Sequence, residues 1–306
     1  MKVCEVILLL VLLCGSVFSV QAERLNHERL DDFVHHQHDS IVNEIWLSAD
    51  RPGAGTGSEV LRLGTVQWET GFEVAHIPGA HLLTLPATLF RFGLPKRAEL
   101  RLEYSGVEYV PDKPGNPSDG VNDPFYTPSH LSFGTKINLF ENHGKQHTLR
   151  WVPRTSLLLC LGLPTSSALA KHMPVAGSVD LLFENEVTDW LSLGYDVGIQ
   201  WNEWAPTPDV FTSVGFNFEA TDRLGCFVEA FAFFDPDAMD TSMRTVTHCN
   251  VNLNFGLTYA VHPRVQLDIY AGFNCYNSEP LVSAPQNNAF VGFGAAWLIW
   301  HTENRH

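Results

Sequence analysis

Residues 190–202 read WLSLGYDVGIQWN, and large apolar side chains alternate there with small or polar ones. Every second residue from Leu191 to Trp201 is large and apolar, while Ser, Gly, Asp, Gly and Gln stand between them. A period of two predicts a β-strand with one apolar and one polar face. Such strands need an apolar phase on one side and a polar phase on the other. The same alternation recurs in residues 66–74, 98–104, 249–261 and 265–274.

Twelve segments of this kind follow one another along the chain. They are expected at residues 63–76, 83–94, 98–106, 130–140, 149–163, 178–187, 191–202, 209–220, 224–234, 247–261, 265–275 and 288–300. Strands of globular proteins centre on about 5–6 residues, whereas a tilted strand needs about 9–11 residues to cross a bilayer. The expected segments have the length of membrane-spanning strands.

The joints between these segments come in two kinds that alternate. Tight turns are expected at PKR (95–97), TDW (188–190), TDR (221–223) and HPR (262–264), and longer loops at residues 105–129, 165–177, 235–246 and 276–287. Two joints depart from this rule, because IPGAH after the first segment is short and ENHGKQHT at residues 141–148 is long. Short turns at one end and long loops at the other are typical of a transmembrane meander.

The pattern therefore predicts an all-β fold, a single antiparallel transmembrane β-barrel of about 12 strands of the outer-membrane type. The sheet must close, because a free strand edge in lipid would leave backbone groups without hydrogen bonds. Aromatic residues near strand ends fit an interface belt. These residues are Tyr104, Trp151, Trp190, Trp201, Trp204, Tyr276, Trp297 and Trp300.

The N-terminus has the features of an export signal. Lys2, an apolar stretch and the sequence VQA ending at Ala22 predict a signal peptide over residues 1–22. Residues 23–62 are expected to form a segment that either stays in the periplasm or plugs the lumen, and its GAGTG run is interpreted as a flexible periplasmic lead-in. The barrel is expected over residues 63–300, followed by a C-terminal tail at residues 301–306.

The composition argues against a nucleic-acid partner, and the positions of the cysteines argue against disulfides. The 306 residues are 45% hydrophobic and 17% charged, with a formal net charge of −15. Binding to nucleic acid requires a basic surface, so a nucleic-acid partner is not expected. Cys160, Cys226, Cys249 and Cys275 remain after removal of the signal peptide, and their positions in alternating segments favour small apolar side chains over disulfides.

The polar face of the expected strands predicts the lining of the lumen, in which acids outnumber bases. The candidates are Glu69, Glu73, Arg91, Glu99, Arg101, Glu103, Lys136, Asp180, Glu184, Asp196, Glu219, Glu229, Asn252 and Asp268. Two interpretations are open. Arg91, Arg101 and Lys136 neutralise neighbouring carboxylates in a packed interior, or the acidic lining forms a cation-preferring passage.

A family resemblance covers residues 50–300. It rests on SADRPGAGTGSEVLRLGTVQWETGF, TLPATLFRFGLPKRAELRL, SFGTKINLFE, LLFENEVTDWLSLGYDVGIQWN, ATDRLGCFVEAFAFF and FGLTYAVHPRVQLDIYAGFN. Together these stretches resemble the outer-membrane transporter family labelled "MetA-pathway of phenol degradation", in particular its Bacteroidetes-type members. The resemblance implies a transporter barrel and brings no catalytic residue with it.

Enzymatic alternatives have little support in the sequence. His35, His36, His38 and Asp39 form a polar tract without distant ligands at a metal-site spacing, which favours a solvated tract. Ser213, His248 and Asn250 have the residue types of a lipid hydrolase, but no local hydrolase signature surrounds them. No catalytic residue, metal site or cofactor is therefore expected, and the protein is not expected to be an enzyme.

The leading functional hypothesis is an outer-membrane transporter or porin-like barrel that passes small solutes through a polar, net acidic lumen. A closed structural, ligand-binding or adhesion barrel is the second hypothesis, and a barrel lipid hydrolase is the third. The expected partners are the lipid bilayer, a small-molecule solute of unknown identity with hydrophobic or aromatic solutes included, and the periplasmic chaperones and barrel-assembly machinery. The expected location is the bacterial outer membrane.

Overall fold

A computed structural model of the chain describes residues 47–77, 80–110, 125–129, 131–141, 152–163, 165, 176–188, 190–201, 207–239, 245–278 and 289–301. The expected signal peptide, the histidine-containing tract and the C-terminal tail beyond residue 301 lie outside the described residues. Among the described residues, no helix is long and apolar enough to cross a membrane.

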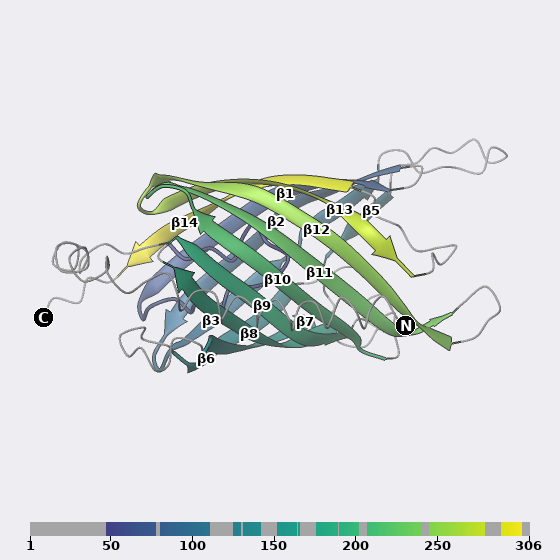
Figure 1. Ribbon diagram of the computed structural model, residues 1–306, viewed down its shortest axis with the longest axis horizontal. Helices are drawn as coiled ribbons and strands as arrows, with labels where there is room; N and C mark the ends of the chain where they lie inside the picture. Colours follow the sequence, from purple (N-terminus) through teal and green to yellow (C-terminus); the bar gives the residue numbers. More distant parts are fainter. Residues whose placement is uncertain are drawn as a thin grey trace, which may run out of the picture.

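The described strands form one antiparallel sheet (Figure 1). They are β1 (Thr65–Ile77), β2 (Ala80–Leu94), β3 (Ala98–Tyr104), β4 (Val107–Val110), β5 (Phe125–Pro128), β6 (Leu131–Phe140), β7 (Arg154–Leu163), β8 (Ala176–Thr188), β9 (Leu191–Trp201), β10 (Asp209–Glu219), β11 (Leu224–Met239), β12 (Thr245–His262), β13 (Val265–Asn277) and β14 (Ala289–His301). All of them except β4 and β5 correspond one to one with the segments expected from the alternation of side chains.

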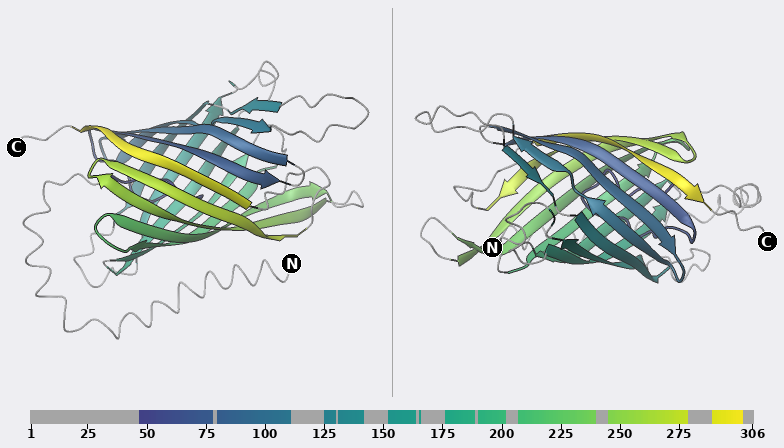
Figure 2. Two further views of the ribbon diagram at one scale, coloured as in Figure 1. Left: turned by 90° about the horizontal axis from the view of Figure 1, so that it is seen from above. Right: turned by 180° about the vertical axis from the view of Figure 1, so that it is seen from behind.

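The sheet closes because β1 pairs with strands on both of its edges. Thr65 is opposite His301 of β14, and Val66 is opposite Phe92 of β2. The ring then runs β1, β14, β13, β12, β11, β10, β9, β8, β7, β6, β3 and β2. The expected all-β, closed antiparallel barrel of about twelve strands is confirmed. Figure 2 shows the strands inclined to the barrel axis around the whole ring.

The stretch expected as a loop at residues 105–129 differs from the expectation, since it contains the short hairpin of β4 and β5. The first half of β2 extends past the end of β3, so that β3 pairs only with residues 88–94 of β2. The strand β4 continues along the same edge of β2, with Tyr109 opposite Leu83. The pairing satisfies backbone groups that the shorter β3 cannot reach.

A second difference concerns β7, which was expected to begin at residue 149. It begins at Arg154, directly after Pro153, a residue without a backbone N–H.

Short and long connections separate the two ends of the barrel. Three or fewer residues join β2 to β3, β8 to β9 and β12 to β13, and four join β10 to β11. The two exceptions expected from the sequence are present, since only two residues join β1 to β2 at the other end and 13 residues join β6 to β7 at this end. We call this end the turn end, which is the periplasmic end in outer-membrane barrels. The hairpin of β4 and β5 and the extended tips of β11 and β12 lie at the opposite end, called the loop end here (Figure 1).

The two faces of the sheet differ in the way the alternation predicts. On β13, Leu267, Ile269 and Phe273 are exposed on the outside, while Asp268 and Tyr270 between them are buried inside. Outward exposure of large apolar side chains continues on the neighbouring strands, for example at Phe255, Leu257, Val291 and Phe293. This apolar outer belt is the surface that a lipid bilayer would cover. Most of the buried polar and charged side chains lie on the inside.

Ile269 and Val261 provide a test of membrane depth. Ile269 lies near the middle of β13 and is 54% exposed, while Val261 is 45% exposed at the turn end of β12. Ile269→Arg should reduce the free energy of unfolding by about 2–4 kcal/mol, because the cation would lie at the bilayer midplane, and Val261→Arg should cost about 0–1 kcal/mol near the interface. Reversible unfolding in lipid vesicles measures both values. Equal small losses would contradict a lipid-facing belt.

Candidate functional site

The lumen contains a segment of the chain itself, residues 47–64, which we call the lumen segment. It precedes β1 and turns back inside the barrel, where its hydrogen bonds and ion pairs reach nine of the twelve ring strands. The wall partners are Glu69 (β1), Arg91 (β2), Glu99 and Arg101 (β3), Lys136 (β6), Ser156 (β7), Glu184 (β8), Asp196 (β9), Glu229 (β11) and Asp268 (β13).

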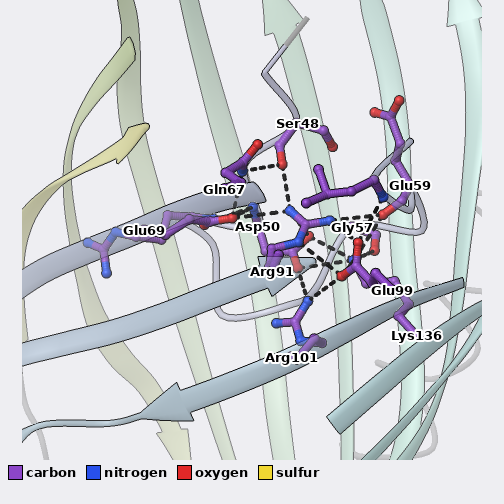
Figure 3. Close-up of polar contacts among 12 residues, drawn as sticks. Ser48, Asp50, Gly57, Glu59, Gln67, Glu69, Arg91, Glu99, Arg101 and Lys136 are labelled. Carbon is purple, nitrogen blue, oxygen red and sulfur yellow. Dashed lines mark hydrogen bonds and ion pairs between the residues drawn. The ribbon is translucent and has the colours of Figure 1, made fainter. Parts of the chain in front are cut away.

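On one side of the lumen, three wall cations face three carboxylates (Figure 3). Arg91 Nη2 lies 2.9 Å from Glu99 Oε2, and Arg91 Nη1 lies 3.1 Å from Glu69 Oε1. Arg101 Nη1 lies 3.1 Å from Glu99 Oε1. The side chains of Arg91, Glu69 and Glu99 are fully buried. The fork of Arg91 thus binds two carboxylates from neighbouring strands with the geometry that favours arginine over lysine.

The third carboxylate of this charge cluster comes from the lumen segment. Asp50 accepts hydrogen bonds from Lys136 Nζ at 3.0 Å and also pairs with Arg101. Burial alone raises the pKa of Asp50, but the charges of Arg91, Lys136 and Arg101 outweigh burial and hold the pKa well below its ordinary value. Asp50 is therefore ionised and balances a wall that by itself carries an excess of positive charge at this point.

The same wall cations bind backbone carbonyl groups of the lumen segment. Lys136 Nζ donates to the carbonyl oxygens of Gly57 at 2.9 Å and Glu59 at 3.0 Å, and Arg91 donates to that of Ser48 at 2.5 Å. These bonds hold the chain in place whatever its side chains are, because every residue has a carbonyl group. This side of the lumen segment is consequently tied down by both ion pairs and charge-assisted hydrogen bonds.

The opposite side of the lumen holds residues 53–56, which we call the glycine-rich limb. The amides of Ala54 and Gly55 donate to the Glu229 carboxylate at 2.7 and 2.8 Å, and the Thr56 amide donates to Asp196 at 3.3 Å. Only a glycine fits at position 55, because a Cβ atom there would lie 2.2 Å from Ser213 Oγ. The limb thus presents bare backbone to two acidic wall residues.

Arg51 connects the lumen segment to the last strands of the barrel. Its Nη2 lies 3.2 Å from Asp268 Oδ1, and its guanidinium carbon lies 5.7 Å from the centre of the Tyr270 ring. Gly71 and Gly294 leave room for it, because a Cβ atom at either position would lie 2.6 Å or less from the guanidinium. Arg51 and Asp50, adjacent in sequence, therefore contact different parts of the wall, Arg51 at β13 and Asp50 at β2, β3 and β6.

Two cavities lie on either side of the lumen segment. The outer cavity, toward the loop end, has a volume of about 580 Å³ and includes Tyr104, Gly162 and Trp201 in its lining. The inner cavity, toward the turn end, has about 330 Å³ and includes Ser192, Phe218 and Gly225. Both are lined by residues of the glycine-rich limb, so this limb lies between them.

The remaining sequence-predicted candidates are spread along the wall. Asp180 and Glu103 line the outer cavity, and Glu219 is exposed at the turn end beside the inner cavity. Glu184 pairs with Arg154 at 3.4 Å and accepts a hydrogen bond from Ser58.

Two more candidates lie elsewhere on the wall, on β1 and β12. Glu73 accepts a hydrogen bond from the Tyr270 hydroxyl, and Asn252 donates to Asn250. These positions are dispersed around the ring, in contrast to the compact cluster at Arg91.

The sequence left open whether the segment before β1 stays in the periplasm or plugs the lumen, and it did not mark the aromatic residues of the interior. The GAGTG run was expected to be a periplasmic lead-in, and instead it lies inside the lumen, because the acidic wall supplies acceptors for its amides. Aromatic side chains also face inward. Phe233 and Phe231 follow Glu229 with a spacing of two, which is the signal that places them on the inner face. Trp201, expected in the interface belt, lines the outer cavity.

The residues considered for lipid hydrolysis take part in other contacts. Ser213 donates its backbone amide to Asp196 and lies against Gly55, and His248 pairs with Asn277. Within the described part of the chain, no hydrogen bond joins Ser213 to His248. The described residues include no group of three or more potential metal ligands.

No family model and no curated protein matches the chain. An outer-membrane channel from Pseudomonas putida F1 is structurally similar, with a TM-score of 0.61 and 10% identity over 81% of this chain and 99% of the channel. The NanC porin has a TM-score of 0.46 and 8% identity over 76% and 98% of the two chains. The toluene transporter TbuX of Ralstonia pickettii has a TM-score of 0.38 and 9% identity over 79% and 90%.

At these identities the comparisons support the fold, and the first similarity carries that support. The closed barrel and its apolar belt are those of outer-membrane proteins, so the expected location in the bacterial outer membrane, and the bilayer as a partner, are confirmed. These solved barrels are channels, porins and transporters. The resemblance to the family labelled for phenol degradation stays a prediction.

Asp50 provides a test of the charge cluster. Asp50→Asn should destabilise the folded barrel by about 3–5 kcal/mol, because it leaves buried cations without their partner. Glu59→Gln is the matched control, since the Glu59 side chain is exposed in the same segment. A carboxyl group whose pKa is lower in the folded than in the unfolded protein stabilises the folded state at every pH above its unfolded pKa, which is about 3.9. This stabilisation is lost only as the pH falls toward the pKa of the group in the folded protein. The difference between wild type and Asp50→Asn should therefore be the same at pH 7 and pH 5.

The thermal midpoint of heat-modifiable migration in detergent measures these differences. Equal midpoints for wild type and Asp50→Asn, or a difference that disappears between pH 7 and pH 5, would contradict the role given to Asp50.

Proposed function

We propose that this protein is an outer-membrane transporter whose lumen segment acts as a plug between two solute-accessible cavities. The observation that carries the proposal is the position of the glycine-rich limb between the outer cavity of about 580 Å³ and the inner cavity of about 330 Å³. Cavities of a few hundred cubic ångströms are of the size that holds small ligands. Passage of a solute then requires movement of the plug rather than of the barrel wall.

The bonding of the lumen segment supports opening at its glycine-rich limb. Residues 48–51 are held by buried ion pairs to Arg91, Lys136 and Arg101. Breaking a buried ion pair costs about 3–5 kcal/mol. The limb itself is held by amide hydrogen bonds to Asp196 and Glu229, each worth about 1.5–3 kcal/mol because the acceptor is charged. The limb is the side of the plug that opens at the smaller energetic cost.

The lumen chemistry supports a preference for cations. Lys136, Arg91 and Arg101 are neutralised by Asp50, Glu69 and Glu99. On the other side, Asp196 and Glu229 accept hydrogen bonds from amides and have no ion pair among the described contacts. Uncompensated carboxylates beside a narrow passage attract cations and repel anions. The neutralised interior and the acidic passage, which the sequence offered as alternatives, thus describe different sides of one lumen.

A closed binding or structural barrel is the second candidate function. The observation that favours it is the number of strands to which the lumen segment is bonded, since a segment tied to nine strands also stabilises the barrel. In that case the plug is permanent and the protein conducts no ions.

Two glycine substitutions distinguish a movable plug from a permanent one. Gly55→Ala should displace the limb, because the added Cβ would lie 2.2 Å from Ser213 Oγ and less than 3 Å from the Asp196 and Glu229 carboxylates. Gly57→Ala is the matched control, because its Cβ would meet only Asp50 Oδ1, at 3.4 Å. In planar bilayers, Gly55→Ala should raise the single-channel conductance at least severalfold over wild type, and Gly57→Ala should leave it unchanged. Silent channels in all three folded proteins would support the closed barrel instead.

The selectivity of the open variant tests the acidic lumen. Adding Glu229→Gln to Gly55→Ala should lower the cation preference measured by reversal potential across a salt gradient, because it removes a lumen charge that has no cation partner. Adding Glu141→Gln should have no effect, since Glu141 pairs with Arg97 outside the lumen at the turn end. An anion-preferring or indifferent pore in the Gly55→Ala background would overturn the assignment of cation preference.

A further inference from the structure

The outer cavity combines an acidic wall with an aromatic one. Its lining carries five carboxylates and two guanidinium groups, and both guanidinium groups are already paired, Arg101 with Asp50 and Arg51 with Asp268. The carboxylates in the lining are Asp50, Glu69, Glu103, Asp180 and Asp196. The cavity thus has a net negative lining and also contains the apolar side chains of Leu158, Leu182 and Phe233.

Asp180 is a carboxylate of this cavity that has no cation partner among the described residues. It accepts a hydrogen bond from the Ser178 hydroxyl at 2.7 Å. In the described part of the chain, no cation lies within ion-pair distance of it, in contrast to Glu69 and Asp50. A carboxylate accepts about four hydrogen bonds, so most of the capacity of Asp180 is unused by the protein. A cationic donor in the cavity would use that capacity.

An aromatic pair lies in the same row of the sheet as Asp180. Asp180 is opposite Gly198, Gly198 is opposite Phe211, and Phe211 is opposite Phe233. The rings of Phe211 and Phe233 lie 5.1 Å apart, measured between their centres, and both line the outer cavity.

Gly198 allows this arrangement, because a Cβ atom there would lie 1.9 Å from Asp180 Oδ1. The glycine therefore leaves a gap through which the Asp180 carboxylate approaches the aromatic pair. A charged group and two rings are brought to one place on the cavity wall.

We propose that the outer cavity is a binding site for an aromatic ammonium ion, with the ammonium group at Asp180 and the ring of the ligand against Phe211 and Phe233. The carboxylate supplies charge-assisted hydrogen bonds, and the phenylalanine pair supplies apolar and cation–π contacts. The volume of about 580 Å³ accommodates a ligand with one or two rings. An aromatic anion of the same size would be repelled by the lining.

This inference rests on the geometry of the outer cavity and does not require transport. A closed barrel with this cavity would bind the same ligand. In a transporter, the bound cation would lie in the cavity that the glycine-rich limb closes, since residues 53–56 are part of its lining. The binding measurement and the conductance measurement therefore fail or succeed independently.

Isothermal titration of the purified, detergent-solubilised full chain with three probes tests the site. The probes are 2-phenylethylammonium, 2-phenylethanol and phenylacetate, which share one ring and differ in charge. We expect the ammonium ion to bind at least about tenfold more tightly than the alcohol, a difference of 1.4 kcal/mol, and we expect no binding of the anion. Ethylammonium, which has no ring, should bind at least about tenfold more weakly than 2-phenylethylammonium.

Two variants test whether the ammonium group of the ligand binds at Asp180. Asp180→Asn should reduce the affinity for 2-phenylethylammonium to that of the alcohol and leave the affinity for the alcohol unchanged. Gly198→Ala should also weaken ammonium binding, because its Cβ displaces the Asp180 carboxylate. Glu219→Gln is the control, since it removes one carboxylate from the inner cavity instead. Heat-modifiable migration confirms that each variant is a folded barrel.

Several outcomes would overturn the proposal. These are binding of phenylacetate as tight as that of the ammonium ion, equal affinities for 2-phenylethylammonium in wild type and Asp180→Asn, or no binding of any probe by the folded wild-type protein. If Asp180→Asn does not fold, the relative affinities of the wild-type protein for the four probes still test the proposal. If binding is found while all channels are silent, the site stands and transport does not. If the channels conduct while no probe binds, transport is supported and the binding site is not.

Discussion

The interior of this barrel depends on one electrostatic constraint, the neutralisation of Arg91, Arg101 and Lys136. Three cations on adjacent strands, each nearly or fully buried, would repel one another and would be costly to remove from water. Glu69 and Glu99 of the wall are not enough to balance them, and Asp50 supplies the missing charge. The wall and the lumen segment are therefore parts of one structure, because neither has balanced charges without the other.

The opposite wall meets the lumen segment in a different way. There the wall is acidic, and the chain presents backbone amides rather than a cation, so that Asp196 and Glu229 are satisfied as acceptors without a cation partner among the described residues. The segment is consequently held strongly on one side and more weakly on the other. In the proposed transporter, the charge cluster holds one side of the plug in place while the glycine-rich limb moves, so that the passage opens without disrupting the barrel.

The outer surface and the lumen follow opposite solvation rules. Apolar residues such as Ile269 and Phe293 are exposed outside, whereas charged residues such as Glu69 and Arg91 are buried inside. Lipid outside penalises every polar group, which makes the outer face nearly uniform. The lumen has no such uniform solvent, and it accommodates ion pairs, phenylalanine rings and bare backbone within one cross-section. Function in a barrel of this kind is therefore determined by the few inner positions that differ from their neighbours.

The sequence alone determined the twelve strands of the closed barrel, although not the short hairpin of β4 and β5. The period of two along segments such as residues 191–201 and the alternation of tight turns with long loops were sufficient, since both are local and lipid imposes them on every strand. The same parity also marked the inner positions of Glu69, Arg91 and Asp268, although it did not distinguish which of them meet.

Only the tertiary structure decided what fills the lumen. Asp50, Arg51 and the GAGTG run lie outside any alternating segment, so no periodicity marks them. Their places depend on partners up to 217 residues away, as for Arg51 and Asp268. The proximity of Asp180 to Phe211 likewise depends on strand register and on the absence of a side chain at Gly198. Backbone pairing propagates locally and can be predicted from a pattern, whereas charge balance and shape inside a closed barrel are properties of the whole ring.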